Sequence, residues 1–457
     1  MGEDVKKESW GSTFGFIMTS IGYAVGLGAI WKFPYMIGMN GGGIFLLLCI
    51  ILAILVAVPL AWGELTLGRY TQCSALVGMR KLEGKGNFWQ AIGWLGFATA
   101  FTLTAYYITI VGDVLFYIFT FISGGLEGLS VDEMASFYTQ LNQDIATKLL
   151  WTALTLVLMT LIISRGVQGG LEAANKILIP CLFIFLFILG IRGLTLPGGI
   201  DGLVWMFQPD FSKLTPSVLY AALNQVFFLA GVGFATMFSF GAYLDPKQSD
   251  IPFNGSIIIL SNMLVAILAG IAIFPALFSY GMEITSGSGL TFQTLPYVFN
   301  EMPMGRLWGG LFFILLFCAG FSTILGLTEG MVSTLSDAFR LDRKKMTFII
   351  VIFLFVCSIP SILSTNVWAH IRPLNMDLFT FMDFLAVGLF CPLGCILIAL
   401  YVAYRFPFSK LVAESSIGAK YFTIPSWMKL WYLAAIPLIT LFVLVVGILS
   451  YLGVNIF

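Results

Sequence analysis

Two adjacent hydroxyl side chains, Ser322 and Thr323, interrupt the apolar stretch FCAGFSTILGLTEG. If that stretch is helical, the carbonyl of Ala319 lies one turn before them. A second stretch, GYAVGLGAIWKFP at residues 22–34, offers further main-chain carbonyls wherever it leaves the helix. Neutral oxygens without a carboxylate suit a monovalent hard cation better than calcium. The candidate ligands are Gly22, Val25, Ala319, Ser322 and Thr323. The alternative is that both hydroxyls only bond carbonyls of their own helix.

The stretch at residues 22–34 is expected to be an interrupted helix. It carries three glycines within seven positions of a longer apolar run, and a membrane helix of about 20 residues rarely does so. Main-chain groups that lose their helical partners inside a bilayer must line a cavity or coordinate something. We therefore expect a ligand site at the membrane midplane.

A second glycine-rich interruption, FFLAGVGFATMF at residues 227–238, contains Gly231 and Gly233. It falls five predicted spans after the first, so the two interrupted spans cross the membrane in opposite directions. This arrangement predicts an inverted repeat of five plus five spans, with the ligand site where the two interruptions meet. The alternative is that these glycines only allow close helix packing.

The composition predicts an all-α polytopic membrane protein. Of 457 residues 59% are hydrophobic and only 10% are charged, whereas soluble proteins carry about 25% charge. The net charge is zero, so nothing indicates nucleic-acid binding. The single histidine, His370, cannot make a zinc site alone, and we expect no disulfide among the seven cysteines.

The apolar runs predict eleven transmembrane helices. Most of the 23 Lys and Arg residues fall at cytoplasmic ends if the N-terminus is inside, which places the C-terminus outside in a multi-pass protein of the plasma membrane. The predicted parts are a cytoplasmic segment 1–12, a first repeat 13–192, an extracellular loop 193–216, a second repeat 217–403, a cytoplasmic loop 404–426 and an eleventh span within 427–457.

Several motifs, in order along the chain, resemble those of the neurotransmitter:sodium symporter family. They are GYAVGLGAIWKFPY (22–35), NGGGIF (40–45), WGELTLGRY (62–70), AYY (105–107), NQVFF (224–228), GVGF (231–234), CAGFST (318–323) and MDF (382–384). The resemblance implies that the five candidate ligands form the family's second sodium site, with sodium as the coupling ion.

The family's first sodium site looks degenerate in this sequence. Its side-chain ligands would fall at Ala29, Leu229 and Asn262, and only Asn262 carries a suitable oxygen. Ala266 stands where chloride-independent members have an acid, and Cys49 replaces the tyrosine that other members use for chloride. Because a desolvated ion needs its ligands, we expect one sodium and no chloride.

The resemblance also implies a substrate site. Monoamine transporters of this family carry an aspartate where this chain has Gly26, so the space is free for a substrate carboxylate. The amides at the start of the half-helix and the Tyr107 hydroxyl would bind that carboxylate. The predicted pocket suits a hydrophobic or aromatic amino acid. Its residues are Tyr23, Ala24, Gly26, Leu27, Gly28, Leu103, Tyr107, Phe228, Leu229, Gly231, Phe234, Thr323, Gly326 and Leu327.

Gates and supporting residues follow from the same resemblance. The outer gate would comprise Lys32, Asp383, Tyr107, Phe234 and Gln225, with Tyr107 and Phe234 as the lid above the substrate. The inner gate would comprise Lys7, Trp10, Tyr243 and Asp337. Glu64 would accept hydrogen bonds from amides freed by the second interruption. The segment from Gly170 to Pro180 would unwind to hydrate the sodium, although a static kink is the alternative.

The sequence therefore predicts a sodium-coupled amino-acid symporter that works by alternating access. Its helices are expected to be embedded in membrane lipid. No convergent acid, base or nucleophile lies in the spans, so we do not expect an enzyme. The alternatives are an amino-acid-binding membrane sensor and a transporter of an atypical small substrate on the same scaffold. The sequence indicates no protein partner.

Overall fold

The structure is a computed structural model that describes residues 8–245, 247, 249–282 and 289–451. Short π- and 3-10 turns are labelled η. The first half contains α1 Thr13–Ala24, η1 Gly28–Lys32, α2 Phe33–Met39, α3 Gly43–Leu52, η2 Ala53–Ala57, α4 Val58–Thr71, α5 Ala75–Glu83, η3 Phe88–Gln90, α6 Ala91–Ser123, α7 Val131–Gln143, α8 Ile145–Ile163, η4 Val167–Glu172, α9 Ala173–Leu194, α10 Gly199–Phe207 and η5 Phe211–Lys213.

The second half is equally helical. It contains α11 Pro216–Ala230, α12 Thr236–Ala242, α13 Ile251–Ser279, η6 Leu290–Thr294, α14 Leu295–Glu301, α15 Gly305–Phe339, α16 Arg343–Leu363, η7 Pro373–Asn375, α17 Leu378–Asp383, η8 Phe384–Phe390, α18 Cys391–Leu400, η9 Tyr401–Arg405, α19 Phe408–Ser415, α20 Met428–Leu430, η10 Trp431–Ala435 and α21 Ile436–Tyr451. Among the described residues there is no β-strand, only an isolated bridge between Gly42 and Pro209.

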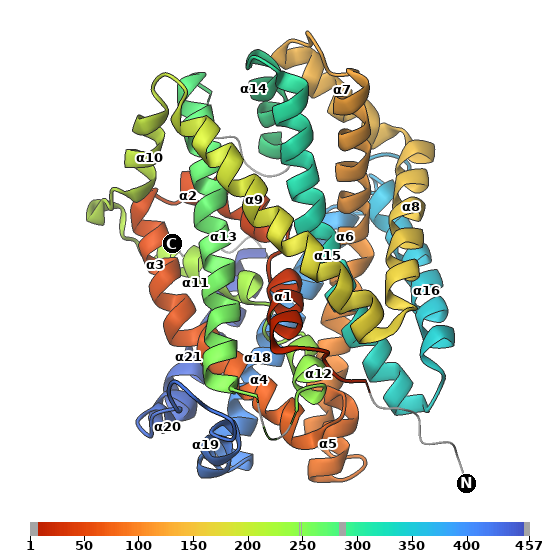
Figure 1. Cartoon of the computed structure of the whole chain (residues 1–457), viewed down its shortest axis with the longest axis vertical. Coiled ribbons are helices and arrows are strands. Elements are labelled where there is room, and N and C mark those ends of the chain that lie inside the picture. The colour runs from red at the N-terminus through yellow and green to blue at the C-terminus, as the bar shows by residue number, and fades with distance from the viewer. Residues whose placement is uncertain (1–7, 246, 248, 283–288, 452–457) are drawn as a thin grey trace.

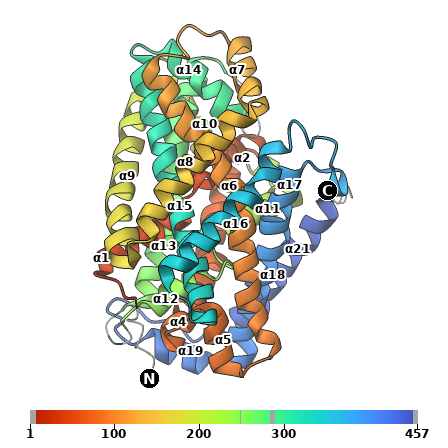
Figure 2. The same ribbon diagram turned by 90° about the vertical axis from the view of Figure 1, so that its right-hand side faces the viewer.

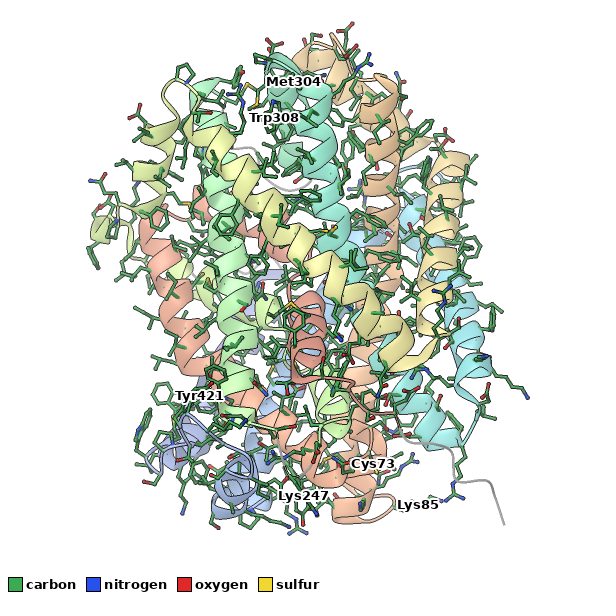
Figure 3. All side chains as sticks on the ribbon, in the orientation of Figure 1. Cys73, Lys85, Lys247, Met304, Trp308 and Tyr421 are labelled. Atoms are coloured by element: carbon green, nitrogen blue, oxygen red, sulfur yellow. The ribbon has the colours of Figure 1, made fainter. Side chains whose placement is uncertain are left out.

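The long helices form a bundle along the long axis of the molecule, and α9 crosses its front face obliquely (Figure 1). The short helices α5 and α19 lie at one end, while α7 and α14 lie at the other, as Figure 2 also shows. Lys85 and Lys247 lie at the α5 end, and Met304 and Trp308 lie at the opposite end (Figure 3).

Nine helices of the described chain are long and apolar enough to cross a membrane, and a tenth span results if α1 and the helix from Gly28 to Met39 are counted together. The predicted count of eleven also requires α11, which has only 15 residues, to form one span with α12. A multi-pass helical membrane protein is therefore confirmed.

The first predicted interruption is present between α1 and η1. Helix α1 ends at Ala24, the next helical turn begins at Gly28, and the two axes differ by 54°. Val25 leaves the helical region with a ψ of 79°. The Gly26 N–H donates to the Ala24 carbonyl at 3.0 Å, so the chain turns tightly instead of winding on.

The second interruption lies between α11 and α12 and uses left-handed backbone. Gly231, Gly233 and Ala235 have φ values of 62°, 84° and 57°. Left-handed residues cannot continue a right-handed helix, so three of them within five positions end α11. At Gly233 a Cβ would lie 2.6 Å from the Cys391 carbonyl oxygen, which shows why a side chain does not fit there.

Helix α15 brings the hydroxyl pair to the first interruption. It is a 35-residue helix that packs against α6, α9, α1 and α12, and it is buried along most of its length. The second interruption is placed against α4, where Gly233 N–H donates to Glu64 Oε1 at 2.6 Å. The scaffold helices therefore hold both interruptions at the centre of the bundle.

We predict that Gly233→Ala destabilises the protein and removes transport. A left-handed φ costs a residue with a side chain about 1–2 kcal/mol, and the added carbon also meets the Cys391 carbonyl. Thermal unfolding of the purified protein in detergent measures the effect as a melting temperature lowered by several degrees. Gly310→Ala is the control, because that helical glycine has nothing within 4 Å of a built Cβ. Equal melting temperatures for both variants would contradict the prediction.

Candidate functional site

Four oxygens converge where α15 meets the end of α1. The Ser322 hydroxyl oxygen lies 2.9 Å from both the Gly22 and the Ala319 carbonyl oxygens. The Thr323 hydroxyl oxygen lies 3.2 Å and 3.1 Å from the same two carbonyls. Each hydroxyl therefore bonds a carbonyl of its own helix and a carbonyl of the interrupted helix, so the pair is not confined to its own helix. Because hydroxyls also carry lone pairs, this donor set fits a monovalent cation. The fifth candidate, Val25, follows α1 directly and is fully buried.

Asn175 on α9 lies beside this oxygen cluster and was missed by the sequence analysis. Its amide oxygen packs so closely against Gly22 that a Cβ there would collide with it. The Asn175 NH2 donates to the Leu171 carbonyl at 2.9 Å, and its oxygen has no hydrogen-bond partner in the described structure. A buried asparagine in an apolar span is the signal that could have found it.

A small cavity of about 30 Å³ lies between the two interruptions. Its walls contain every predicted substrate residue except Leu27 and Gly326. Those two residues contact side chains that line the cavity. Leu27 N–H donates to the Tyr107 hydroxyl at 2.5 Å, and Gly326 leaves room for the Tyr23 ring. The Tyr23 hydroxyl donates to the Gly231 carbonyl at 2.5 Å, so it joins the first interruption to the second. The lining residues are Tyr23, Ala24, Gly26, Gly28, Leu103, Tyr107, Phe228, Leu229, Gly231, Phe234, Thr323 and Leu327.

A larger cavity of about 510 Å³ adjoins the small one. Gly28, Tyr107 and Phe228 line both cavities and form the partition between them. The sequence analysis paired Tyr107 with Phe234 as the lid, but Phe234 lines only the small cavity, so the structure favours Phe228 as the partner of Tyr107. Phe228 lies beside Tyr107 in the partition between the two cavities. Its ring packs directly against Gly28, because that glycine has no side chain to exclude it.

The two charged residues of the predicted outer gate, Lys32 and Asp383, line the larger cavity but do not pair with each other. The Lys32 ammonium lies 4.7 Å from the centre of the Phe228 ring, and Asp383 accepts a hydrogen bond from Tyr106 at 2.6 Å. No ion pair joins Lys32 to Asp383 in the described structure. The Phe228 ring stabilises the Lys32 charge through a cation–π contact, and the Tyr106 hydroxyl stabilises the Asp383 charge through a hydrogen bond. Gln225 lies deeper and donates to the Gly28 carbonyl at 3.3 Å.

At the other end of the bundle, Trp10 donates to the Phe240 carbonyl at 3.0 Å and packs edge-on against the Tyr243 ring. The Tyr243 hydroxyl donates to Glu329 at 2.9 Å, and Arg343 forms an ion pair with the same buried carboxylate. The sequence analysis assigned no role to either Glu329 or Arg343. Of the other predicted residues, Asp337 accepts from the Ser74 amide at 2.8 Å, and Lys7 lies outside the described residues.

The segment from Gly170 to Pro180 is helical here. A π-helical turn, η4, leads into α9, which continues through Pro180 without a break. The predicted unwinding of this segment therefore needs a different conformation and stays a prediction. Glu172 in the π-helical turn accepts hydrogen bonds from the Gly11 amide at 2.7 Å and from the Ser12 hydroxyl at 3.0 Å, so it holds the start of α1.

Two further buried charges have clear structural partners. Glu64 is fully buried and accepts from the freed Gly233 amide of the second interruption, as described above. Asp113, to which the sequence analysis gave no role, forms a 2.9 Å ion pair with Lys148. The Lys148 ammonium also lies 2.9 Å from the Asn142 side-chain oxygen. The pair lines the larger cavity and ties α6 to α8.

Asn262 lies in the region of the predicted degenerate sodium site and is buried. The Asn262 NH2 group, instead of its oxygen, faces the main chain and donates to the carbonyls of Ala24 and Leu229. Cys49 and Ala266 are fully buried and supply neither a hydroxyl nor a carboxylate.

The fold and the site together define a helical membrane protein with two interrupted helices around a small central cavity. The sequence matches the profile of the Sodium:neurotransmitter symporter family over residues 7–135 and 134–456. The chain belongs to this family of membrane transporters, which are not enzymes.

Individual relatives agree with this assignment. The chain is 35% identical to the sodium-dependent transporter YhdH of Bacillus subtilis, covering 98% of this chain and 99% of the relative. It is 35% identical to a sodium-dependent transporter of Methanocaldococcus jannaschii over 89% and 84% of the two chains. It also resembles the crystal structure of MhsT in complex with L-phenylalanine, with a TM-score of 0.88, 35% identity and coverage of 96% and 99%. Sodium is therefore the coupling ion.

We predict that the double substitution of Ser322→Ala and Thr323→Ala abolishes sodium-dependent substrate binding, because it removes two of the four converging oxygens. Binding of a radiolabelled amino acid to purified protein across a sodium titration measures the loss. Thr334→Ala is the matched control on the same helix, since its buried hydroxyl bonds only the Gly330 carbonyl one turn back. An unchanged sodium affinity in the double variant would show that the ion binds elsewhere.

Proposed function

We propose that this symporter imports a hydrophobic or aromatic amino acid together with one sodium ion, independently of chloride. One observation carries the proposal: an aromatic-lined cavity lies between two interrupted helices and shares Thr323 with the four-oxygen cluster. An ion and a substrate that meet at one side chain can bind cooperatively, because each orders a group that the other needs.

The carboxylate of the substrate would bind beside Gly26. A Cβ on Gly26 would lie 2.7 Å from the Tyr107 hydroxyl oxygen and 3.1 Å from the Thr323 hydroxyl oxygen, so the missing side chain opens space next to two polar groups. The amides at the start of η1 and its positive dipole end also face this region. An aspartate at position 26 would repel a carboxylate, which supports an amino acid over an amine.

The side chain of the substrate would enter between aromatic rings. The cavity of about 30 Å³ holds roughly one water molecule, so the bound state requires rearrangement of the lining residues. Phe228 is the residue we expect to move, because it lines both cavities and packs on Gly28, which offers no side-chain contact of its own. The L-phenylalanine bound in the related MhsT structure supports an aromatic or large apolar substrate.

The membrane arrangement completes the proposal. Counting α11 and α12 as one span gives eleven spans in two inverted sets of five plus one, with the boundaries predicted from the sequence. The N-terminus would be cytoplasmic and the C-terminus extracellular. Lys85 and Lys247, which lie at the α5 end in Figure 3, support this orientation through the positive-inside rule.

Transport would proceed by alternating access. Sodium at the four-oxygen cluster would favour the form open to the larger cavity, and the substrate would then close the partition at Tyr107 and Phe228. Release would require separation of the contacts that hold α1 at the cytoplasmic end, including those of Trp10 and Glu172. Each ligand can shift these states only through its different affinity for them.

Uptake into proteoliposomes tests the proposal. We predict that radiolabelled phenylalanine or a branched amino acid accumulates only under an inward sodium gradient, with one sodium entering per substrate and no effect of replacing chloride by gluconate. Simultaneous measurement of sodium flux and substrate flux gives the ratio. Binding without flux would identify a sensor, and accumulation without a sodium gradient would contradict sodium coupling.

A further inference from the structure

Stacked aromatic rings separate the central cavity from a cavity of about 820 Å³ at the α5 end of the bundle. Tyr23 lines the central cavity, and Trp10 lines the cavity at the α5 end. The Phe240 ring lies between them, with its centre 5.7 Å from the centre of the Tyr23 ring and 5.3 Å from that of the Trp10 ring. Trp10, Phe240 and Tyr23 therefore form an aromatic barrier, in which α12 supplies one side and the stretch before α1 supplies the other.

The α12 side of this barrier rests directly on α4. A Cβ on Gly68 of α4 would collide with the Phe238 carbonyl oxygen of α12. A Cβ on Gly241 of α12 would lie 2.5 Å from the Leu65 carbonyl oxygen of α4. The two backbones are therefore in close contact over this stretch, so the end of α4 supports the helix that carries Phe240.

Arg69 directly follows Gly68, and its side chain holds two stretches that are distant in the sequence. Arg69 is 1% exposed. Its Nη1 donates to the Ser249 carbonyl at 2.6 Å and to the Ile417 carbonyl at 2.9 Å. Its Nε lies 3.0 Å from the Glu414 carboxylate, and its Nη2 donates to the Glu414 carbonyl. A guanidinium group has five donors in one rigid plane, so a single side chain can fix several acceptors in place.

Two neighbouring contacts hold the same stretches. The Gln72 side-chain amide donates to the Arg69 and Leu244 carbonyls, both at 3.0 Å. The Asp250 carboxylate accepts from the Lys420 main-chain amide at 2.7 Å. The chain that follows α12 is therefore tied both to α4 and to the segment that begins with α19, and these helices lie at one end of the bundle (Figure 1). This set of contacts, here called the Arg69 anchor, consists of Arg69, Gln72, Leu244, Ser249, Asp250, Glu414, Ile417 and Lys420.

We propose that Arg69 is a positioning residue for transport, which fixes the α12 side of the aromatic barrier so that Trp10 closes against a fixed surface. This inference rests on the proposed alternating access. The two sides of the barrier are held by separate contacts, since Glu172 holds the stretch before α1 and the Arg69 anchor holds the chain after α12. The first side can therefore separate while the second stays in place. A weakened anchor lowers the population of the closed barrier, because Trp10 then meets a mobile partner.

A cysteine in place of Ser20 reports whether the barrier is closed. Ser20 is fully buried, and its hydroxyl has no hydrogen-bond partner in the described structure, so Ser20→Cys removes no bond. It lies four residues after Phe16, which lines the cavity at the α5 end, and four before Ala24, which lines the central cavity. Residues four apart share a helix face, so Ser20 lies between the two cavities. The parent protein for the test carries Ser20→Cys and Cys73→Ser, which removes the partly exposed native thiol.

The experiment measures how fast a charged methanethiosulfonate reagent labels this cysteine in lipid nanodiscs, in sodium and in potassium. Glu414→Gln should raise the labelling rate in sodium about threefold to tenfold, the range that the net energy of a hydrogen bond gives. Gln72→Met should raise the rate in the same direction while keeping every charge, so it decides the question if Glu414→Gln does not fold. Glu83→Gln is the matched control, because Glu83 forms a 2.8 Å ion pair with Arg405 at the same end, outside the Arg69 anchor. It should label like the parent.

The outcomes separate this inference from the proposed function. Folded Glu414→Gln and Gln72→Met proteins that melt at lower temperature but label at the parent rate would show a structural role only and would overturn the inference. An equal increase in Glu83→Gln would overturn it as well, because any lost contact at this end would then open the barrier. A parent protein that labels equally fast in sodium and in potassium would instead contradict the proposed effect of sodium, and the comparison of variant with parent would still decide the role of Arg69.

Discussion

Main-chain groups freed inside a bilayer must find partners, and this requirement shapes the centre of the molecule. Two helices stop in the middle of the bundle, and side chains from uninterrupted helices satisfy the exposed main chain. Glu64 accepts from Gly233 N–H, Asn262 donates to the ends of both α1 and α11, and Tyr107 accepts from Leu27 N–H. Each partner comes from a different scaffold helix, so the interruptions are held from several sides.

The same requirement produces the site. Gly22 and Ala319 present carbonyls that Ser322 and Thr323 can reach, and these four oxygens form next to the cavity because the first interruption and α15 pack together. The cavity is small, with a larger space of about 510 Å³ on one side and one of about 820 Å³ at the cytoplasmic end of the proposed topology. The central layer between them therefore separates two compartments, as alternating access requires.

The sequence predicted the two helix interruptions, the hydroxyl pair and most of the cavity lining, because residue type and spacing within short stretches determine them. Both helix interruptions were predictable from their glycines. At the second interruption, Gly231 and Gly233 have a left-handed backbone that glycine adopts readily. The hydroxyl pair was predictable from its type and spacing. Nearly all of the cavity lining followed from the family motifs.

Features that depend on side-chain direction or on distant pairing were not predictable. Phe228, and not Phe234, separates the cavities, because ring placement depends on how α11 turns at its end. Asn262 carries a suitable oxygen, but only the structure shows that its NH2 faces the carbonyls. The ion pairs of Glu329 with Arg343 and of Asp113 with Lys148 join separate helices, and sequence spacing gives no means of pairing them.

A high-resolution map of the protein in lipid nanodiscs, recorded with sodium and a bound amino acid, tests the account most directly. The account predicts one ion peak enclosed by the oxygens of Gly22, Ala319, Ser322 and Thr323, with both helices interrupted beside it. An ion peak between the carbonyls of Ala24 and Leu229, or helices that wind unbroken through residues 25–27 and 231–235, would contradict it.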